Sequence, residues 1–395
     1  MPSRRAVVRG IAAGLVGSGV GGTATAEVGD ARSRAPAEPA AGSPTYRYDA
    51  GNTGTTTATG PTDQPSVVWR RQFRHPTFAP PAVGRETVFQ PTVDGRLVAL
   101  SAADGTPRWR ASVPGGLVTT PALSTAGLLL ANENREVQSL AAANGSRQWG
   151  VGDIARGGGA CAPTLANGLV YTGGADGLVH GFDCATGTTH WELRLPEAVL
   201  SSFAVADDRL FVAAGRRVYA VDASRVPDAA GTAAGVAAVT REPVWSHGFD
   251  ARIRPAVVAR DGRVVVATDA GVTALSSETG AVVWSLSTAA PVRAAPAVGA
   301  DRLVVPTAAG DLVGVGTDGT EQWRTSLGVT VDTPPVVADG RCYAQRRDGT
   351  VFALDPETGE VSWQYDHDGA GPTAPVAVDD RLYLTDWDGS LTVLA

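Results

Sequence analysis

The chain has 395 residues and a formal net charge of −7, and hydrophobic residues make up 43% of it. Its 48 glycines and 26 prolines are too many for a helical protein, but they suit a chain full of tight turns. It contains no lysine, which excludes Schiff-base chemistry, and its mildly acidic balance argues against nucleic acid as a partner.

The N-terminus has the pattern of a Tat export signal. Arg4 and Arg5 form a twin-arginine pair, residues 10–26 are uncharged, and residues 24–26 (Ala-Thr-Ala) have the form of a cleavage site. The uncharged stretch is too short and too glycine-rich to span about 30 Å of hydrocarbon well, which disfavours a membrane anchor. We expect a Tat signal peptide over 1–26, a disordered linker over 27–45, and an extracellular or cell-envelope mature protein without a membrane span.

Tryptophan recurs at an almost constant interval through the rest of the chain. Successive gaps are 40, 40, 42, 54, 39, 39 and 40 residues. A period near 40 is typical of a repeat architecture, and it decides the fold before any local pattern does. The repeated positions are Trp69, Trp109, Trp149, Trp191, Trp245, Trp284, Trp323 and Trp363.

Other residues keep the same register. A glycine stands four places before six of these tryptophans, for example Gly105 and Gly359, and we expect it to turn the chain between the third and fourth strands of a unit. Asp-Gly pairs at 94–95, 176–177, 348–349 and 388–389 predict tight hairpins with positive φ angles. Short β-like runs such as 375–378, 381–385 and 390–394 lie between turns, which predicts four strands per unit.

The two ends of the repeat region are incomplete in complementary ways. The C-terminus supplies three strands and stops before a tryptophan strand, while residues 66–73 form an isolated tryptophan strand with no strand before it. Pairing the two ends completes an eighth unit and hides sheet edges. The sequence therefore predicts an all-β fold over 46–395: an eight-bladed β-propeller of four-stranded antiparallel blades, whose last blade is closed by the N-terminal strand.

The fourth repeat is irregular. Residues 226–240 form an insertion rich in Pro, Ala and Gly, and Arg241 stands where other repeats have glycine. We interpret the insertion as a tolerated surface loop, with a binding loop as the alternative.

These landmarks resemble the PQQ-type propeller repeat. The run Val-Phe-Ala-Leu-Asp-Pro-Glu-Thr-Gly at 351–359 with Trp363, and Phe-Asp-Cys-Ala-Thr-Gly at 182–187 with Trp191, are similar to that family's repeat. The resemblance implies that the eight repeated tryptophans dock one blade on the next. It also implies one of two roles: a quinoprotein alcohol or sugar dehydrogenase that binds pyrroloquinoline quinone and calcium, or a non-enzymatic exported protein of the BamB type. The acidic, lysine-free composition further resembles proteins of salt-loving archaea.

The dehydrogenase branch lacks support in the sequence. Such enzymes are much longer, and many carry a disulfide between adjacent cysteines, whereas Cys161, Cys184 and Cys342 are well separated. We expect all three to behave as small apolar residues without a disulfide. The five histidines show no pairing at ligand spacing, and no nucleophile elbow is present. We therefore expect no catalytic residues, no metal and no cofactor.

A candidate binding surface lies on one rim of the propeller. We define the rim as the hairpins between second and third strands together with the links between blades. Trp387 falls outside the tryptophan register in such a hairpin, and an aromatic near arginines suits ligand or protein contact. The candidate rim residues are Trp387, Arg346, Arg347, His367 and Arg252; packing of Trp387 on its own blade, and a solvated connector at 366–368, are the alternatives.

The sequence thus favours an exported, non-catalytic module that binds a protein or another ligand at the cell envelope. The alternatives are a quinoprotein dehydrogenase and a lyase-like or glycosidase-like propeller, which would need carboxylates and histidine clustered at the rim.

Overall fold

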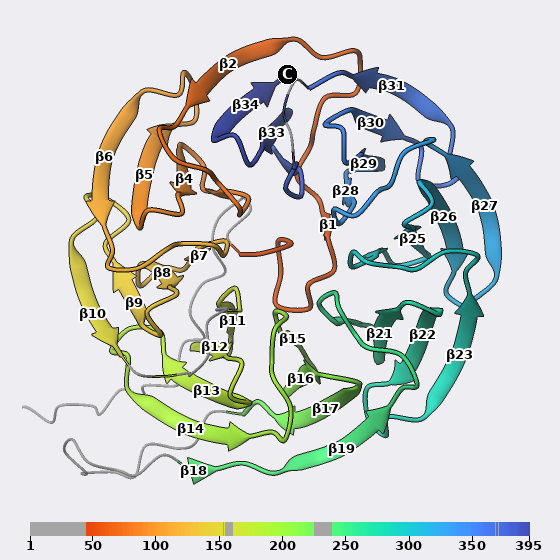
Figure 1. Ribbon diagram of the computed structural model, residues 1–395, viewed down its shortest axis with the longest axis horizontal. Coiled ribbons are helices and arrows are strands. Elements are labelled where there is room, and N and C mark those ends of the chain that lie inside the picture. The colour runs from red at the N-terminus through yellow and green to blue at the C-terminus, as the bar shows by residue number, and fades with distance from the viewer. Residues whose placement is uncertain (1–44, 153, 155–160, 225–238, 368, 370) are drawn as a thin grey trace, which may run out of the picture. The chain divides into compact units, whose positions relative to one another are not determined.

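The computed structural model describes residues 45–152, 154, 161–224, 239–367, 369 and 371–395, and within them the strands form eight sheets arranged in a ring (Figure 1). Arg4 and Arg5, the signal, most of the linker and most of the insertion lie outside the described residues. Each sheet contains a blade of four antiparallel strands, ordered from the axis outwards in chain order except at the closing blade, and two of the sheets carry a fifth, parallel strand at one edge. The predicted eight-bladed β-propeller is confirmed.

The strands of blades 1 to 4 follow the chain from residue 82. They are β3 (Ala82–Val83), β4 (Thr87–Pro91), β5 (Arg96–Ser101) and β6 (Pro107–Ser112); β7 (Ala122–Leu123), β8 (Leu128–Ala131), β9 (Val137–Leu140) and β10 (Arg147–Val151); β11 (Thr164–Ala166), β12 (Leu169–Gly173), β13 (Leu178–Asp183) and β14 (Thr189–Arg194); and β15 (Ala204–Ala206), β16 (Arg209–Ala214), β17 (Arg217–Asp222) and β19 (Pro243–Gly248).

Blades 5 to 8 continue to the C-terminus. They are β20 (Val258–Arg260), β21 (Arg263–Thr268), β22 (Gly271–Ser276) and β23 (Val282–Ser287); β24 (Ala297–Val298), β25 (Arg302–Pro306), β26 (Asp311–Gly316) and β27 (Glu321–Ser326); β28 (Val336–Ala338), β29 (Arg341–Gln345), β30 (Val351–Leu354) and β31 (Val361–Tyr365); and β32 (Val376–Val378), β33 (Arg381–Thr385), β34 (Ser390–Leu394) and the N-terminal strand β2 (Val67–Gln72).

Blade 8 closes the ring. Strand β2 pairs antiparallel with β34, with Trp69 opposite Val393 and Gln72 opposite Ser390. Beyond the strand, the Ser66 and Ala395 backbones bond each other in both directions, at 2.8 and 3.0 Å. The predicted closure by the N-terminal strand is therefore confirmed, and no blade keeps an open edge at the junction of the two chain ends.

No sequence pattern predicted the role of the segment before β2. We call residues 45–61 the clasp; it contains β1 (Thr55–Thr56), which pairs in parallel with β28. The clasp crosses the centre of the ring, inside the innermost strands (Figure 1). Its backbone carbonyls accept amide hydrogens from the inner strands of successive blades, namely Ala50 from Val205, Gly51 from Ala259, Thr53 from Val298 and Gly54 from Val337.

Polar side chains of the clasp fix it further. The Arg47 guanidinium is buried and donates to the carbonyls of Ala295 and Pro296 of blade 6, at 2.8 and 2.5 Å. The Tyr48 hydroxyl accepts the Ala377 amide of blade 8 at 2.6 Å, and buried Asn52 donates to the Phe203 carbonyl of blade 4. The expectation that the closing strand has no strand before it is wrong, because a run of Thr, Gly and Asn without apolar alternation carries no strand signal.

The repeated tryptophans lie between blades. In five blades and the closing strand, the indole Nε1 donates to a carbonyl of the next blade, at distances from 2.8 to 3.1 Å; the acceptors are Ala102, Ala142, Cys184, Ser277, Thr317 and Pro356. In blade 7, Trp363 donates instead to Pro61 of the clasp, at 3.2 Å. The glycine that stands four places before six of the tryptophans packs on the indole of the preceding blade. At Gly105, for example, an added Cβ would lie 2.6 Å from the Trp69 ring.

The contact between blades 3 and 4 breaks this pattern at Trp191, which lies on β14 of blade 3. The indole is fully buried, yet its Nε1 has no hydrogen-bond partner among the described residues. Arg241, which replaces the glycine, places its guanidinium 6.0 Å from the ring centroid and bonds Asp222 at 2.8 Å. At the end of the insertion, β18 (Val239–Thr240) runs parallel to β14 and adds a fifth strand to blade 3. The end of the insertion thus covers the strand that carries Trp191.

The two axial faces carry different kinds of hairpin. In blades 3, 4, 5, 7 and 8 the hairpins between first and second strands are two-residue turns with positive φ at both positions, as at Asp207-Asp208 and Asp379-Asp380, which is the geometry of type I′ turns. The Asp-Gly pairs lie at the other end, between second and third strands. The hairpins predicted at these pairs are present, but only the glycine has positive φ, 79° at Gly95, and each turn spans four or five residues between its strands.

The cysteines make no disulfide, as predicted. Cys161 and Cys342 are buried, and burial raises the pKa of each thiol to about 12. The exposure of Cys184 is intermediate. The buried thiols therefore stay protonated at neutral pH, where the thiolate is the reactive form.

Replacing Trp191 by alanine should lower the free energy of unfolding by about 3–5 kcal/mol, because the fully buried indole leaves a cavity between blades. Val283→Ala, on an exposed face of β23, is the matched control and should change it by no more than about 0.5 kcal/mol. Urea unfolding followed by far-ultraviolet circular dichroism measures both. A loss below about 1 kcal/mol at Trp191 would contradict a blade-docking role.

A thiol reagent at pH 8 should modify Cys184 alone in the native protein and all three cysteines in denaturant. The reason is the raised pKa of the Cys161 and Cys342 thiols, whose thiolate fraction becomes appreciable only as the pH approaches about 12. Absorbance titration with an aromatic disulfide reagent counts the reactive thiols. Rapid native modification at Cys161 or Cys342 would refute their burial.

Candidate functional site

Trp387 forms an exposed aromatic pair with Phe78 on the rim. The ring centroids are 5.5 Å apart with an interplanar angle of 68°, and the side chains are 54% and 47% exposed. Trp387 belongs to the hairpin between β33 and β34, and Phe78 to the link between β2 and β3. The pair therefore joins a residue near the C-terminus to one near the N-terminus, at the closing junction of the ring.

The local backbone holds the Trp387 indole in place. Its amide donates to the Gly371 carbonyl at 3.2 Å, and the indole packs directly on Gly371, where any Cβ would collide with the ring. Gly371 has a φ of 65°, in the left-handed region that favours glycine. Trp387 thus packs on its own blade, which was the alternative to a binding role, and it still presents about half of its surface to solvent.

Arg346 and Arg347 lie on the neighbouring blade 7, in the hairpin between β29 and β30. Arg346 bonds Asp348 and the Leu327 carbonyl and packs 5.4 Å from the Phe352 ring. Arg347 is more exposed and forms an ion pair with Asp332. These ion pairs raise the pKa of both guanidinium groups and partly neutralise them, so the hairpin presents paired rather than free cations.

His367 does not belong to an exposed surface. Only 3% of it is accessible, so its assignment to an exposed binding rim is wrong, while the adjacent Asp366 is exposed. Its Nε2 lies 3.2 Å from the Thr392 hydroxyl and 4.0 Å from the carboxylate of Asp386, which is itself buried. Burial raises the pKa of Asp386.

Arg252 is exposed but far from the pair around the ring. It lies in the link before β20 of blade 5, three blades from blade 8. Trp387 therefore lies beside Phe78 of the N-terminal link, on the blade next to that of Arg346 and Arg347, whereas Arg252 lies on a separate part of the ring. Phe78 was missed because an isolated Phe in a link carries no signal; only the closure brings it to Trp387.

A hollow of about 1440 Å³ occupies the opposite axial face. Part of its lining comes from the clasp and the rest from hairpins between first and second strands, which by topology lie at the other end of each second strand from the rim. We call it the axial hollow. Its lining includes residues 123–126, 165–169, 299–300 and 55–59, with Asp49, Asp183, Arg260, Asp339 and Asp379 as its charged members.

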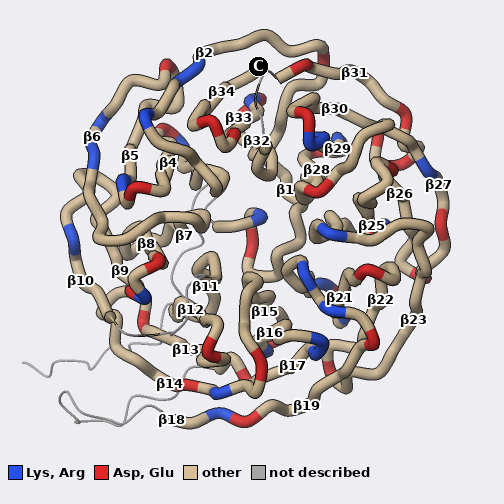
Figure 2. The backbone as a smooth tube through the Cα atoms, in the orientation of Figure 1, with Lys and Arg blue, Asp and Glu red and all other residues tan. Residues whose placement is uncertain are grey.

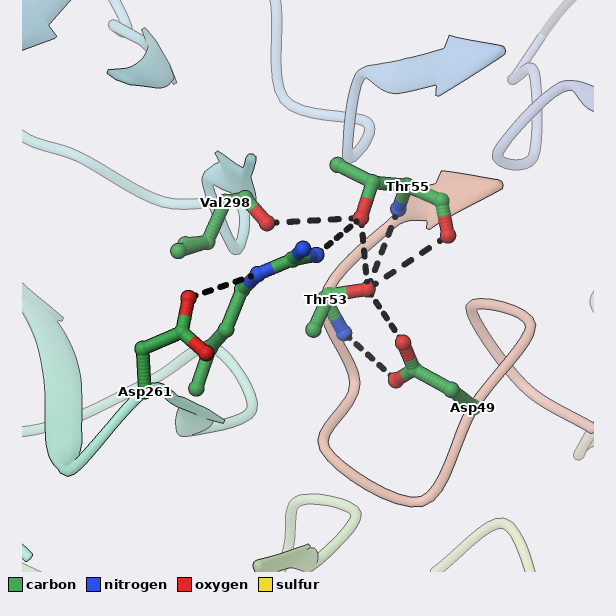
Figure 3. Close-up of polar contacts among 6 residues, drawn as sticks. Asp49, Thr53, Thr55, Asp261 and Val298 are labelled. Carbon is green, nitrogen blue, oxygen red and sulfur yellow. Dashed lines mark hydrogen bonds and ion pairs between the residues drawn. The ribbon is translucent and has the colours of Figure 1, made fainter. Parts of the chain in front are cut away.

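A polar network of the clasp borders the hollow (Figure 3). The Asp49 carboxylate accepts the Thr53 amide at 2.9 Å and also its hydroxyl, and the Thr53 hydroxyl lies 2.9 Å from that of Thr55. The Arg260 guanidinium donates to the Thr55 hydroxyl at 3.0 Å and pairs with Asp261 at 3.1 Å. Burial raises the pKa of Asp49 despite these bonds. Each member is engaged with another, so the network holds the clasp to blades 5 and 6.

Three further properties concern metal binding, charge and membrane-spanning helices. Within the described residues, no group of three or more His, Cys, Asp or Glu could hold a metal ion. Along the backbone, residues of both charges are interspersed around the ring (Figure 2). No helix in the described part of the chain is long and apolar enough to cross a membrane.

Comparisons with known proteins agree with the fold. A family model described as outer membrane protein assembly factor BamB matches residues 54–156, 133–226, 224–318 and 268–395, which together span far more than half of the chain. No curated protein matches it.

Solved structures of two kinds share the architecture. BamB from Moraxella catarrhalis is 17% identical with a TM-score of 0.66, and the match covers 84% of this chain and 97% of that one. Quinohemoprotein alcohol dehydrogenases from Pseudomonas putida HK5 (ADHIIG) and Comamonas testosteroni are each 12% identical, with TM-scores of 0.72 and 0.70; they cover 90% and 89% of this chain, and 80% of their own chains is matched. At such identities the likeness shows the fold alone, and proteins with this fold include both an assembly factor and enzymes.

The resemblance of the repeats at 182–187 and 351–359 is therefore confirmed over nearly the whole propeller: the chain belongs to the family of PQQ-like repeat propellers described by the outer membrane protein assembly factor BamB.

Proposed function

We propose that this protein is a non-catalytic binding module that docks another cell-envelope protein on the rim at the closing junction, through Phe78 and Trp387. The observation that carries the proposal is the exposed aromatic pair, at 47% and 54% accessibility. Two large aromatic rings held together in water retain apolar surface that a partner could bury. Tryptophan in particular is enriched among residues that dominate binding energy.

The support beneath the pair favours a docking role. Gly371 fixes the indole from below, and the Thr77 hydroxyl, next to Phe78, donates to the Asp386 carbonyl at 2.7 Å. Both rings are thus anchored before any partner arrives. A preorganised aromatic contact loses little conformational entropy on binding, which raises affinity for a given buried area.

The partner that suits this surface is a protein with an apolar side chain at the centre of its contact. Neighbouring charges are paired, as His75 is with Asp94 at 3.4 Å and Arg96 is with Asp94 at 3.0 Å. Paired rim charges add orientation rather than strong attraction. The acidic balance of the chain and the mixed charge around the ring disfavour nucleic acid.

The quinone does not suit the residues present. Pyrroloquinoline quinone is a tricarboxylate, and the axial hollow has four lining carboxylates against one guanidinium, Arg260, which already pairs with Asp261. The clasp also crosses the axis of the ring. We derive no catalytic step through this cofactor, and the absence of lysine removes one further donor to quinone oxygens.

Export by the Tat pathway is part of the proposal. It rests on the Arg4-Arg5 pair and the uncharged stretch at 10–26. A protein that folds before export requires no disulfide, which is consistent with three free cysteines.

A photo-crosslinking residue placed at Phe78 should give one discrete adduct with an envelope protein in the producing cells, and Trp387→Ala should abolish it. The reason is that the indole forms half of the proposed contact. Gel shift and mass spectrometry of the adduct measure the result.

The same residue at Leu200 is the matched control, since Leu200 is a large apolar side chain, 63% exposed, in a link of the same rim between blades 3 and 4. Equal adducts from both positions, or none from Phe78, would refute docking at this pair.

Titration of the purified protein with pyrroloquinoline quinone at millimolar calcium should produce no saturable absorbance change and no alcohol-dependent or sugar-dependent dye reduction. The acidic lining of the axial hollow is the reason. Saturable binding together with substrate oxidation would instead establish a quinoprotein dehydrogenase.

A further inference from the structure

The innermost strand of each blade turns one backbone amide towards the axis. In blade 2, Ser124 and Gly127 bond each other in both directions, at 2.8 and 3.3 Å, so the preceding residue, Leu123, lies at a non-bonded position of the ladder. Leu165 of blade 3 and Val205 of blade 4 occupy the same register, opposite Val170 and Leu210. Their amides and carbonyls face away from their own sheets.

In blades 4 to 7 the clasp bonds these amides. The Val205 amide donates to Ala50 at 2.7 Å, and the Ala259, Val298 and Val337 amides donate to clasp carbonyls at 2.8 Å. In blade 8 the Ala377 amide donates to the Tyr48 hydroxyl. The clasp thus shows how an extended segment binds at the axis: in blades 4 to 7, one of its carbonyls accepts a hydrogen bond from the inner-strand amide.

Blades 2 and 3 are different. The described residues of the clasp make no hydrogen bond to the Leu123 or Leu165 amide. Both residues line the axial hollow. Its volume of about 1440 Å³ exceeds the roughly 300–1,000 Å³ of ordinary small-molecule sites. The two inner edges therefore face an open space large enough for a segment of chain.

The walls of this space are acidic. Asp339 and Asp379 are exposed in their hairpins, and Asp49 and Asp183 add two more carboxylates, while Arg260 is engaged with Thr55 and Asp261. A small anion would meet like charge. A metal ion would lack a ligand set, because no cluster of three candidate ligands exists within the described residues. Neither ligand would supply carbonyl acceptors for the two amides.

We infer that the axial hollow binds an extended, basic peptide segment of a partner protein, whose backbone pairs with the Leu123 and Leu165 amides and whose arginine or lysine side chains meet Asp339 and Asp379. Strand addition to an exposed edge is a general mode of peptide recognition, with main-chain bonds giving affinity and side chains giving specificity. The site lies on the axial face opposite the Phe78–Trp387 pair and stands independently of the docking proposed there.

Proline substitution distinguishes the contribution of the backbone N–H to peptide binding from that of the side chain. Leu165→Pro removes the axis-facing N–H and leaves the ladder to β12 intact, because proline is tolerated at an edge position whose N–H points away from the sheet. Leu165→Ala keeps the donor and shortens the side chain, so it is the matched control. Leu123→Pro and Leu123→Ala form the equivalent pair in blade 2.

The probe is the fluorescein-labelled peptide Gly-Arg-Thr-Arg-Val-Arg-Gly, read by fluorescence anisotropy with the full folded protein. Binding should be saturable, about tenfold weaker in Leu165→Pro, and within about twofold of the parent in Leu165→Ala. Asp339→Asn with Asp379→Asn should also weaken it. The peptide Gly-Glu-Thr-Glu-Val-Glu-Gly should not bind. Equal binding of both peptides, no binding of the basic one, or indifference to both proline variants would overturn the inference.

Amide hydrogen exchange provides a test that needs no variant. The Leu123 and Leu165 amides should exchange quickly in the free protein and slow at least tenfold with the basic peptide, while the Val205 and Ala259 amides, bonded to the clasp, stay slow throughout. Slow exchange at Leu123 and Leu165 without peptide would mean that the chain's own preceding residues cover these edges, and it would overturn the inference.

Discussion

The inner strands of a propeller present unpaired backbone groups to the axis, and the way in which they are satisfied governs much of this structure. Buried amides without an acceptor cost free energy, so a ring of eight short inner strands needs partners along its centre. The clasp supplies them for blades 4 to 8, through carbonyls of Ala50, Gly51, Thr53 and Gly54 and the Tyr48 hydroxyl. It also leads directly into β2, so the segment that fills the axis and the strand that closes the ring are one continuous piece.

That continuity makes the closing junction a composite of both chain ends. The Pro61 carbonyl of the clasp accepts hydrogen bonds from the Trp363 indole at 3.2 Å and the Tyr343 hydroxyl at 3.1 Å, both on blade 7. In other blades the acceptor for the preceding indole lies in the turn between the third and fourth strands. Further along, Phe78 reaches Trp387. The proposed docking surface therefore exists only in a closed ring, and a ring opened at blade 8 would lose both stability and binding.

Blade contacts elsewhere repeat a single device: an indole that donates to the next blade and packs on its glycine. Blade 4 departs from it, with Arg241 in the place of glycine over Trp191 and β18 added beside β14. A planar guanidinium can stack on an aromatic face, so the substitution keeps the contact while it changes its chemistry. The insertion thus begins and ends at a modified blade contact rather than at an ordinary turn.

The sequence by itself determined the architecture, because spacing is a one-dimensional property. The tryptophan period, the glycine four places earlier and the complementary ends were enough to predict eight blades and closure through residues 66–73. Trp387 was noticed because it falls outside that period. The family resemblance followed from the same spacing and is borne out from residue 54 onward.

Only the tertiary structure decided which residues share a surface. The clasp has no apolar alternation, so its role at the axis follows from acceptors that five separate blades need and that no local pattern reveals. The sequence placed His367 on an exposed rim between two aspartates, but in the structure it is buried beside Asp386. Phe78, Leu123 and Leu165 gained their proposed roles from neighbours distant in the chain. Periodicity fixes how many times a unit repeats, whereas a site depends on contacts between units, and these are set by packing in three dimensions.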